Sequence, residues 1–289
     1  MANTRLSSAR TLRILACQIA VPTIRDSAAR DRHLERVSER LRAEIDAQSA
    51  DVVVLPELSS IEYSREAFEC LGSLAETFDG PSFRVFSPLA QETRTPIVYG
   101  IPRADGDRVL ISQVVVGAGG DYLGHYDKLH MAHYGASFEK DYFCPGNQLL
   151  VLELVGMRIA PMICYDIRFP ELARTLVVRH GAELLLHCSA YYADESYYSW
   201  HPFVVTRALE NQVPILSLNR AGESFGSSIY CPPWVDDTQP EIVFPKEESY
   251  RIIEINPDLS RAARERYTFL EDRIGEASEY DALPAVTVR

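Results

Sequence analysis

The chain has 289 residues, with 46% hydrophobic and 24% charged side chains and a formal net charge of −12 at pH 7. This composition is ordinary for a globular protein with a sizeable core. The negative charge argues against nucleic acid and anionic membrane surfaces as partners, and no apolar stretch reaches the ~20 residues that a membrane span needs.

Short apolar runs alternate with helical patterns along the chain. Strands are predicted at Leu12–Ile19, Asp51–Leu55, Pro96–Ile101, Leu110–Val116, Arg158–Ile163, Glu183–His187, Val213–Leu218 and Tyr250–Ile255. Helices are predicted at Arg25–Gln48, Ser82–Thr93, Pro170–His180, Trp200–Asn211 and Asp258–Phe269. This alternation indicates an α/β fold with helices on the outer faces of sheets. Because no linker-like segment divides the chain, we expect one domain over 1–289, with its core at about 12–255 and a C-terminal helix and tail at 256–289.

The six cysteines are scattered and form no CxxC pair. A zinc site or a disulfide framework is therefore not expected, and the histidines at 125, 130 and 133 lack the spacing of a helical metal pair. The first 13 residues lack the apolar core of a secretory signal. These features predict a cytoplasmic protein without a bound metal.

Cys164 stands where a buried strand gives way to a turn and a helix. The apolar run Met157–Ile163 leads into it, and a polar turn then reaches a helix that starts near Pro170. A thiol at such a turn is held rigidly beside backbone N–H groups, which can stabilise an oxyanion. Cys188, at the end of the next predicted strand, is the rival thiol. Its neighbour His187 points to the opposite face of that strand, so a packed, inert cysteine is favoured there.

Three further side chains suit catalysis by their position. Glu57 follows an apolar strand and a proline, so desolvation could raise its pKa and make it a base for a thiol; a loop carboxylate facing water is the alternative. Lys128 lies among ring-bearing and apolar residues and could be a fixed charge in a pocket, although an ordinary solvated lysine is the commoner identity. Glu139 could be a second acid, but beside Lys140 a surface carboxylate is the simpler interpretation.

Together these segments resemble the nitrilase superfamily of carbon–nitrogen hydrolases. The similarity rests on motifs in the family's order, at Leu55–Leu58, Tyr126–His130, Phe138–Asn147 and Cys164–Glu171, and continues through Arg207–Gln212 and Asn219–Gly222. It covers residues 12–230. The resemblance implies a four-layer α-β-β-α sandwich with its site at the sheet ends. It also implies a dimer formed through the helices predicted at Pro170–His180 and Trp200–Asn211.

The resemblance assigns a role to each of the four side chains. Cys164 would be the nucleophile and Glu57 the general base. Lys128 would stabilise the tetrahedral intermediate together with the backbone N–H of Tyr165. Glu139 would position the substrate amide or assist proton transfer to the leaving amine. No metal or organic cofactor is implied.

The residues after the nucleophile favour an amide substrate over a nitrile. The nitrile-hydrolysing branch typically has Trp-Glu after its cysteine, whereas Tyr165-Asp166 follows Cys164 and is similar to amidases of the omega-amidase type. N-carbamoyl amine or amino-acid hydrolases are close relatives and stay open. The candidate substrate-binding residues are Tyr165, His133, Ser189 and Tyr191. Arg168 could attract a substrate carboxylate, but a salt bridge with Glu171 or Asp166 is favoured.

The chain also departs from the family pattern after Ser228. Tyr230–Asp237 replaces the usual strand turn, and Glu271–Gly275 replaces the usual ending. Three functions therefore stay open: a thiol amidohydrolase for a small amide or ureido compound that forms a homodimer or higher homo-oligomer, a nitrilase, and a non-catalytic binding member of the fold. The joint presence of the four catalytic candidates favours an enzyme.

Overall fold

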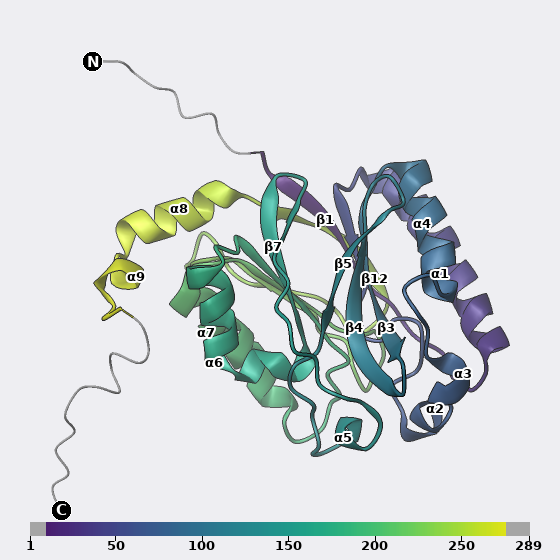
Figure 1. The fold of residues 1–289 in the computed structure, drawn as a ribbon. Coiled ribbons are helices and arrows are strands. Elements are labelled where there is room, and N and C mark those ends of the chain that lie inside the picture. Colours follow the sequence, from purple (N-terminus) through teal and green to yellow (C-terminus); the bar gives the residue numbers. More distant parts are fainter. Residues whose placement is uncertain (1–9, 276–289) are drawn as a thin grey trace, which may run out of the picture.

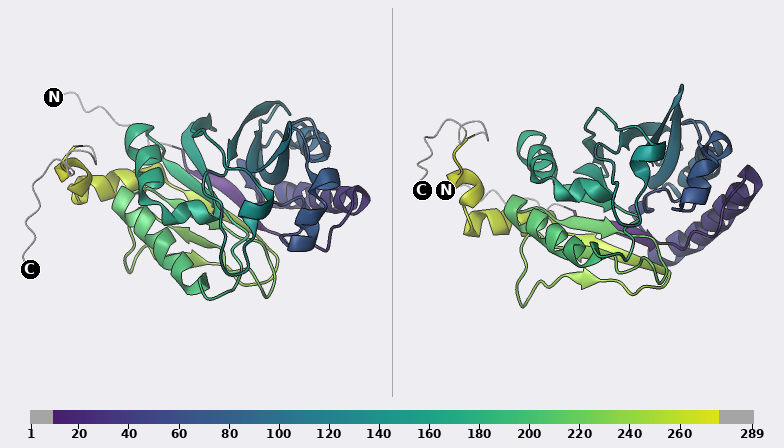
Figure 2. Two further views of the ribbon diagram at one scale, coloured as in Figure 1. Left: turned by 60° about the horizontal axis from the view of Figure 1, so that its bottom comes forward. Right: turned by 90° about the horizontal axis from the view of Figure 1, so that it is seen from below.

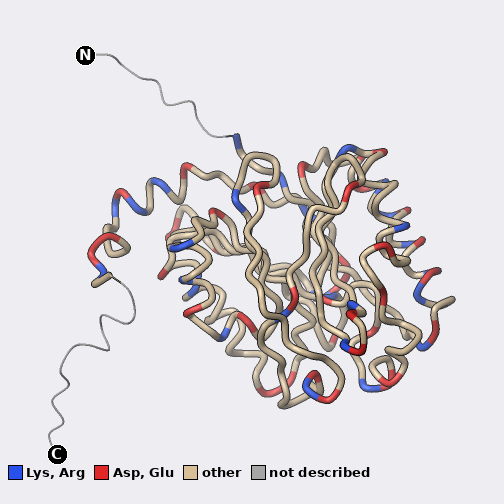
Figure 3. The backbone as a smooth tube through the Cα atoms, in the orientation of Figure 1, with Lys and Arg blue, Asp and Glu red and all other residues tan. Residues whose placement is uncertain are grey.

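Two six-stranded sheets stack face to face, and helices cover their outer faces (Figure 1). The computed structural model describes residues 10–275. This arrangement is the α-β-β-α sandwich that the resemblance implied. Charged residues gather on the outer helices and the connecting loops, whereas the strands are mostly uncharged (Figure 3). No helix in residues 10–275 combines the length and the apolar character that crossing a bilayer requires.

The first sheet has the strand order β12-β1-β2-β3-β4-β5. Its strands are β1 Leu12–Gln18, β2 Val52–Val54, β3 Ile97–Asp105, β4 Arg108–Val116, β5 Tyr122–Asp127 and β12 Ser249–Ile255. Helices α1 (Ser27–Gln48) and α4 (Pro81–Thr93) cover its outer face. Helix α1 begins at Asp26, whose side chain accepts a hydrogen bond from the Ala29 N–H at 2.7 Å, a standard N-cap.

The second sheet has the order β11-β10-β9-β8-β7-β6, with β7, β8 and β9 parallel. Its strands are β6 Leu152–Leu154, β7 Met157–Ile163, β8 Leu184–Cys188, β9 Ile215–Leu218, β10 Ile229–Cys231 and β11 Ile242–Val243. Its outer face is covered by α6 (Pro170–Arg174), a π-helical turn (Thr175–Arg179) and α7 (Trp200–Asn211). The short or peripheral helices are α2 Arg65–Glu69, α3 Leu71–Leu74, α5 Glu139–Tyr142, α8 Pro257–Arg266 and α9 Phe269–Asp272. Helices α8 and α9 project from the sandwich on the side of α6 and α7 (Figure 2).

Alternation along the strands divides the apolar side chains among the layers. Ile14 and Val54 of the first sheet pack against Leu186 of the second in the layer between the sheets. Their neighbours Leu15 and Val53 face α1 and α4 instead. Both faces of the central strands are therefore buried, which explains why these strands read as continuous apolar runs.

All eight predicted strands are present, with boundaries that differ by a few residues. The largest difference is β3, which extends to Asp105 because it pairs with β4 over its whole length. Strands β5, β6, β10 and β11 were not predicted, since they are short or half-exposed. The predicted helix Pro170–His180 is divided into α6 and the π-helical turn.

The sheet topology brings segments that are distant in the sequence to one end of the sandwich. Strand β3 is parallel to β2, and β5 returns to the same direction after the antiparallel β4. Glu57 and Lys128 follow β2 and β5, so they lie at the same end of the first sheet. Cys164 follows β7 of the second sheet, and the segment after the parallel β8 donates a hydrogen bond to Glu57. Both sheets thus present their site residues at the same end.

Candidate active site

The four side chains that the resemblance implicates converge at this end of the sandwich. Glu57 and Lys128 lie just after β2 and β5, Glu139 begins α5, and Cys164 follows β7 directly. The side chains of Glu57, Lys128 and Glu139 are fully buried, and Cys164 is 7% exposed. The Cys164 thiol interacts electrostatically with all three.

Lys128 bridges the two carboxylates. Its Nζ lies 2.8 Å from Glu57 Oε1 and 2.6 Å from Glu139 Oε1. The other carboxylate oxygens accept hydrogen bonds from backbone N–H groups, Glu57 Oε2 from Ala190 and Glu139 Oε2 from Ala132, each at 2.7 Å. Buried charges are stable only when they are paired and hydrogen-bonded. These contacts therefore fix the geometry of all three side chains.

The electrostatics of the group favour proton transfer within it. Burial alone would lower the pKa of Lys128, but Glu139 and Glu57 outweigh burial and raise that pKa well above its usual value. Burial raises the pKa of Glu57, with Lys128 acting in the opposite direction. Burial and then Glu57 also raise the pKa of the Cys164 thiol. With both carboxylates ionised, moving the thiol proton to Glu57 leaves the net charge unchanged, whereas losing it to solvent would add a buried negative charge.

Asp166 holds the turn that carries Cys164. Cys164 has a φ of 44°, a left-handed conformation that disfavours residues with a Cβ, and it opens a 3-10 helix. Asp166 Oδ2 accepts hydrogen bonds from the Ile163 N–H at 3.0 Å and the Tyr126 hydroxyl at 2.7 Å. Its Oδ1 accepts from the His130 N–H at 3.2 Å. One buried carboxylate therefore ties the nucleophile turn to the segment that carries Lys128.

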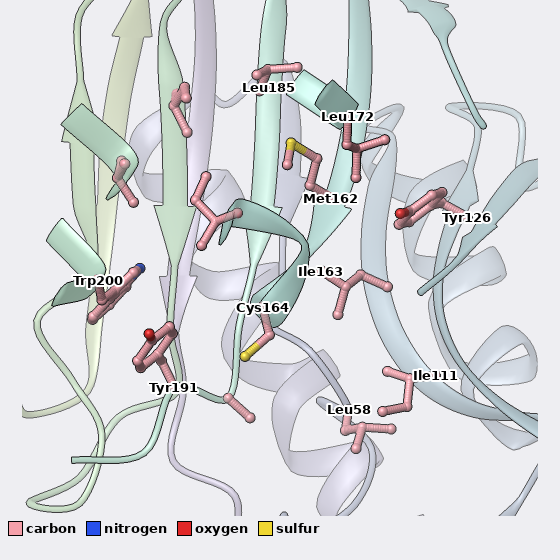
Figure 4. Packing of buried hydrophobic residues seen from close by; sticks show 14 of the residues in the cluster. Leu58, Ile111, Tyr126, Met162, Ile163, Cys164, Leu172, Leu185, Tyr191 and Trp200 are labelled. Atoms are coloured by element: carbon pink, nitrogen blue, oxygen red, sulfur yellow. The ribbon is translucent and has the colours of Figure 1, made fainter. Parts of the chain in front are cut away.

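A narrow cavity of about 10 Å³ opens beside Cys164, with an aromatic wall formed by Tyr134, Tyr191 and Tyr192. In Figure 4 the sulfur of Cys164 points toward the side on which Tyr191 lies. The space beside the thiol is narrow, so the site suits a small substrate.

Arg168 lies behind this aromatic wall. Its Nη2 donates to the Tyr191 hydroxyl and, at 3.2 Å, to Ser199 Oγ, and its guanidinium carbon lies 5.4 Å from the centre of the Tyr134 ring. The favoured salt bridge with Asp166 or Glu171 is therefore wrong. Asp166 turns instead toward Tyr126 and the Ile163 N–H.

The four candidate substrate-binding residues occupy different places. Tyr191 lines the cavity. The Tyr165 ring packs edge-on against the Phe169 ring, with 5.3 Å between the ring centres. The backbone N–H of Tyr165 lies in the first turn of the 3-10 helix, where it has no partner within the helix.

Tyr165, His133 and Ser189 are not among the residues that line this cavity, and a role for them in substrate binding stays a prediction. The His133 side chain is 46% exposed, with its Nδ1 3.8 Å from Asp141 Oδ1, because Ala132 and Tyr134 on either side of it face inward. Ser189 is buried and its Oγ lies 3.4 Å from both ring nitrogens of His187. Its hydroxyl therefore faces the buried ring of His187.

Some site residues carry no signal in the local sequence. The Tyr63 hydroxyl donates to Glu139 Oε1 at 2.8 Å and lies 3.1 Å from Ser137 Oγ, so a residue 76 positions away orients the second carboxylate.

Cys188 packs in the layer between the sheets, on the opposite face from His187, in agreement with the inert role expected for it. Within residues 10–275, no three His, Cys, Asp or Glu side chains are grouped so as to hold a metal ion.

The raised pKa of Glu57 predicts an early acid limb in the pH profile. Glu57 must be ionised to accept the thiol proton, and burial raises its pKa above the usual 4.5. The carboxyl therefore stays protonated to a higher pH than an exposed one, and activity is lost at a higher pH as the solution is acidified. We expect kcat/KM to fall with an apparent pKa above 4.5 while intrinsic fluorescence reports a folded protein. An acid limb at or below 4.5 would contradict this role for Glu57.

Gly100 on β3 supports the loop that carries Glu57. A Cβ at Gly100 would lie 2.5 Å from both Pro56 O and Leu58 N, which are backbone atoms. Gly100→Ala should therefore displace the loop, lower kcat by about 10–100-fold and destabilise the fold by roughly 1–3 kcal/mol. Gly72→Ala is the matched control, because nothing lies within 4 Å of its Cβ position. Equal kcat and melting temperature in the two variants would refute the supporting role of Gly100.

Comparison with known protein families identifies the fold's relatives. The carbon-nitrogen hydrolase family model matches residues 13–265. The chain belongs to this family. As a carbon–nitrogen hydrolase of the nitrilase superfamily, it shares its fold with the yeast protein Nit3, described as a member of branch 10 of that superfamily. Its structure superposes with a TM-score of 0.78 at 22% identity and covers 90% of this chain and 95% of Nit3.

Two curated relatives carry different activity names. A nitrilase of Pyrococcus abyssi is 32% identical over 253 residues, which cover 80% of this chain and 91% of the relative. The omega-amidase NIT2 of Bos taurus is 26% identical over 278 residues, which cover 90% of this chain and 97% of the relative. The comparisons thus show the carbon–nitrogen hydrolase family, and the choice between amide and nitrile rests on the site.

Proposed function

We propose that this carbon–nitrogen hydrolase is a thiol amidohydrolase. It cleaves the C–N bond of a small amide or N-carbamoyl compound and releases ammonia through a thioester on Cys164. The observation that carries the proposal is the fully buried ammonium of Lys128, which is held between Glu57 and Glu139 and whose charge opposes the rise that burial causes in the pKa of the Cys164 thiol. A binding module would have no need of a desolvated cation between two carboxylates beside a cysteine.

Acylation begins when Glu57 takes the Cys164 proton. The thiolate attacks the amide carbon, and the charge that moves to the carbonyl oxygen is stabilised by Lys128 and the Tyr165 N–H. Glu57 returns its proton to the nitrogen, the C–N bond breaks, and ammonia leaves a thioester behind. Glu139, fixed by Lys128, Tyr63 and the Ala132 N–H, orients the amide and the ammonium.

Deacylation repeats the same proton movements with water. Glu57 removes a proton from the water that attacks the thioester carbon. The second tetrahedral intermediate collapses, the C–S bond breaks, and Glu57 returns the proton to sulfur. The acid leaves and the thiol is restored. The proposed chemistry uses no metal or organic cofactor, because Lys128 supplies the positive charge.

The residues after the nucleophile and the name of one relative support an amide over a nitrile. Tyr165-Asp166 follows the nucleophile, as in omega-amidase-type enzymes, and the bovine relative is named an omega-amidase.

Arg168 donates to the hydroxyl of the cavity residue Tyr191 and has an aromatic rather than a carboxylate environment. A substrate whose acyl end carries a carboxylate would complement this charge. The relative named nitrilase favours nitrile hydrolysis as the second candidate.

We also expect the chain to act as one domain that assembles into a homodimer or higher homo-oligomer in the cytoplasm. A single apolar layer between the sheets joins the two halves of the sandwich, which supports one domain. Helices α6 and α7 form the outer layer of the second sheet and are the surface through which the resemblance implies dimerisation. Sedimentation velocity of the purified protein tests the assembly.

Ammonia release across a panel of compounds tests the proposed function. The panel contains small aliphatic amides, amides with a terminal carboxylate, N-carbamoyl amino acids and nitriles of matched chain length. We expect the highest kcat/KM for a compact amide, and higher for one with a terminal carboxylate than for its uncharged equivalent. Higher activity on the matched nitrile would replace amidase with nitrilase. No turnover of any compound would favour the non-catalytic function.

A further inference from the structure

His187, a buried group that the proposed mechanism does not use, lies directly behind the nucleophile. It is fully buried on β8, and its Nε2 lies 2.8 Å from the backbone carbonyl oxygen of Cys164. Its Nδ1 lies 2.7 Å from Ser217 Oγ, on the paired position of β9. Ser217 Oγ in turn accepts a hydrogen bond from the indole N–H of Trp200 at 2.9 Å. These contacts form a continuous buried chain from α7 to the nucleophile.

The direction of every hydrogen bond in this chain is determined by its two ends. An indole N–H can only donate, so Ser217 Oγ accepts from Trp200 at one end of the chain. A carbonyl oxygen can only accept, so His187 Nε2 carries the hydrogen that reaches Cys164. Burial lowers the pKa of His187 to about 4, which keeps the ring neutral at pH 7. His187 is therefore the neutral Nε2–H tautomer, and its Nδ1, which carries no hydrogen, accepts the hydrogen bond from the Ser217 hydroxyl.

The carbonyl that His187 holds belongs to the peptide unit that also carries the Tyr165 N–H. No peptide bond in residues 10–275 is cis, so the Cys164 carbonyl and the Tyr165 N–H point in opposite directions within one plane. Fixing the oxygen from behind therefore fixes the direction of the N–H in front. The bond also polarises that N–H and makes it a stronger donor.

The backbone at Cys164 needs such a hold. Its φ of 44° is disfavoured for a residue with a Cβ, and conformations of this kind persist only where surrounding contacts enforce them. Asp166 secures the residue before the nucleophile through the Ile163 N–H, and His187 secures the peptide after it. The two contacts lie on opposite sides of Cys164.

We propose that His187 is a positioning residue for the oxyanion hole: its Nε2–H holds the Cys164–Tyr165 peptide plane and aims the Tyr165 N–H at the oxygen of the tetrahedral intermediate. The inference rests on the proposed function, because it requires an oxyanion formed at Cys164. Trp200 and Ser217 fix the tautomer that makes the donation available.

Two substitutions of His187 test the role. His187→Gln keeps an N–H donor near the position of Nε2, whereas His187→Leu fills similar space without one. Losing an oxyanion-hole donor outright costs about 10²–10³-fold in kcat, so a badly aimed one should cost about 10–100-fold. We expect this loss in kcat for His187→Leu with KM unchanged, and activity within about threefold of wild type for His187→Gln.

A matched control removes a similar contact elsewhere. His201 Nε2 also hydrogen-bonds a backbone carbonyl, that of Ser227 at 2.8 Å, on a part-buried side chain outside the site. His201→Leu should leave kcat within about threefold of wild type. A loss in His201→Leu as large as that in His187→Leu would overturn the proposal, since it would reflect a general effect on the fold.

Alkylation of Cys164 by iodoacetamide separates positioning from damage to the nucleophile. This reaction forms no oxyanion, so its rate, followed by peptide mass, should stay within about threefold in His187→Leu. A large fall in the alkylation rate, or an unchanged kcat, would overturn the positioning role. Wild-type enzyme that stays active after complete alkylation of Cys164 would instead overturn the proposed function itself.

The tautomer gives a test that does not depend on how the variants fold. In wild-type protein labelled with ¹⁵N-histidine, the resonances of His187 at pH 7 should be those of a neutral ring with hydrogen on Nε2. Hydrogen on Nδ1 would overturn the proposal, because Nε2 would then have nothing to donate to Cys164.

Discussion

Replacing Cys164 with alanine is expected to abolish ammonia release, with kcat lower by at least ~10⁴-fold. The variant keeps the Lys128 cluster and the cavity but has no atom that can form the thioester, and removal of a nucleophile is among the largest single losses that enzymes show. The substitution removes one sulfur atom and leaves the backbone contacts of the turn in place, so the fold should stay intact. The measurement is ammonia release at saturating amide, with circular dichroism as the check on folding.

Cys188→Ala is the matched control for this prediction. Cys188 is a buried cysteine at the end of the neighbouring strand β8, and it packs in the layer between the sheets. Burial and Glu57 both raise the pKa of its thiol, and Lys128 does not offset them as it does at Cys164, so the thiol is inert. We expect kcat within about threefold of wild type. Activity that survives in Cys164→Ala, or disappears in Cys188→Ala with the fold retained, would assign the reaction to another group.

Replacing Lys128 with methionine should remove both activity and stability. Methionine fills a similar volume but leaves Glu57 and Glu139 without the cation that joins them. Breaking a buried ion pair by removing one partner costs about 3–5 kcal/mol, and losing the charge that stabilises the oxyanion should lower kcat by about 10³-fold. Urea unfolding and ammonia release measure the two effects.

The stability loss in Lys128→Met should grow with pH. Lys128 opposes the effect of burial on the pKa of Glu57, so without it that pKa, already raised, rises further. The folded variant then holds a proton that the unfolded chain releases above about pH 4.5, so stability falls as the pH rises. We expect a larger deficit against wild type at pH 8 than at pH 5.5. Lys140, an exposed lysine that directly follows Glu139 in the sequence, provides the control variant. Lys140→Met should behave as wild type. A Lys128→Met protein as stable and active as this control would refute the account of the cluster.

The sequence was most informative where one segment carries its own pattern. The apolar runs of β1, β2 and β7 are buried on both faces, so they predicted strands and placed Glu57 and Cys164 at strand ends. Strand β5 was missed because Tyr126 is its only buried residue and because it includes the polar residues His125 and Asp127. That strand brings Lys128 to the end of the sheet where Glu57 lies. The commonest identity for an isolated lysine, a solvated one, was therefore misleading.

Contacts between distant segments could not be predicted from local patterns. Asp166 was expected as a salt-bridge partner for Arg168, but the turn directs its carboxylate to Tyr126 and the Ile163 N–H. The sequence indicated only that His187 lies on the opposite strand face from Cys188, and the registers of β8 against β9 and β7 bring it to Ser217 and Cys164. These partners depend on strand register, which no single segment specifies.

Intact-mass analysis of the acylated protein tests the central claim most directly. Wild-type protein mixed with the best amide of the panel and quenched in acid during steady turnover should gain the mass of the acyl group minus one hydrogen. Peptide mapping should place that mass on Cys164, and hydroxylamine should release it, as expected for a thioester. Turnover without any adduct, or with an adduct on a residue other than Cys164, would contradict the account.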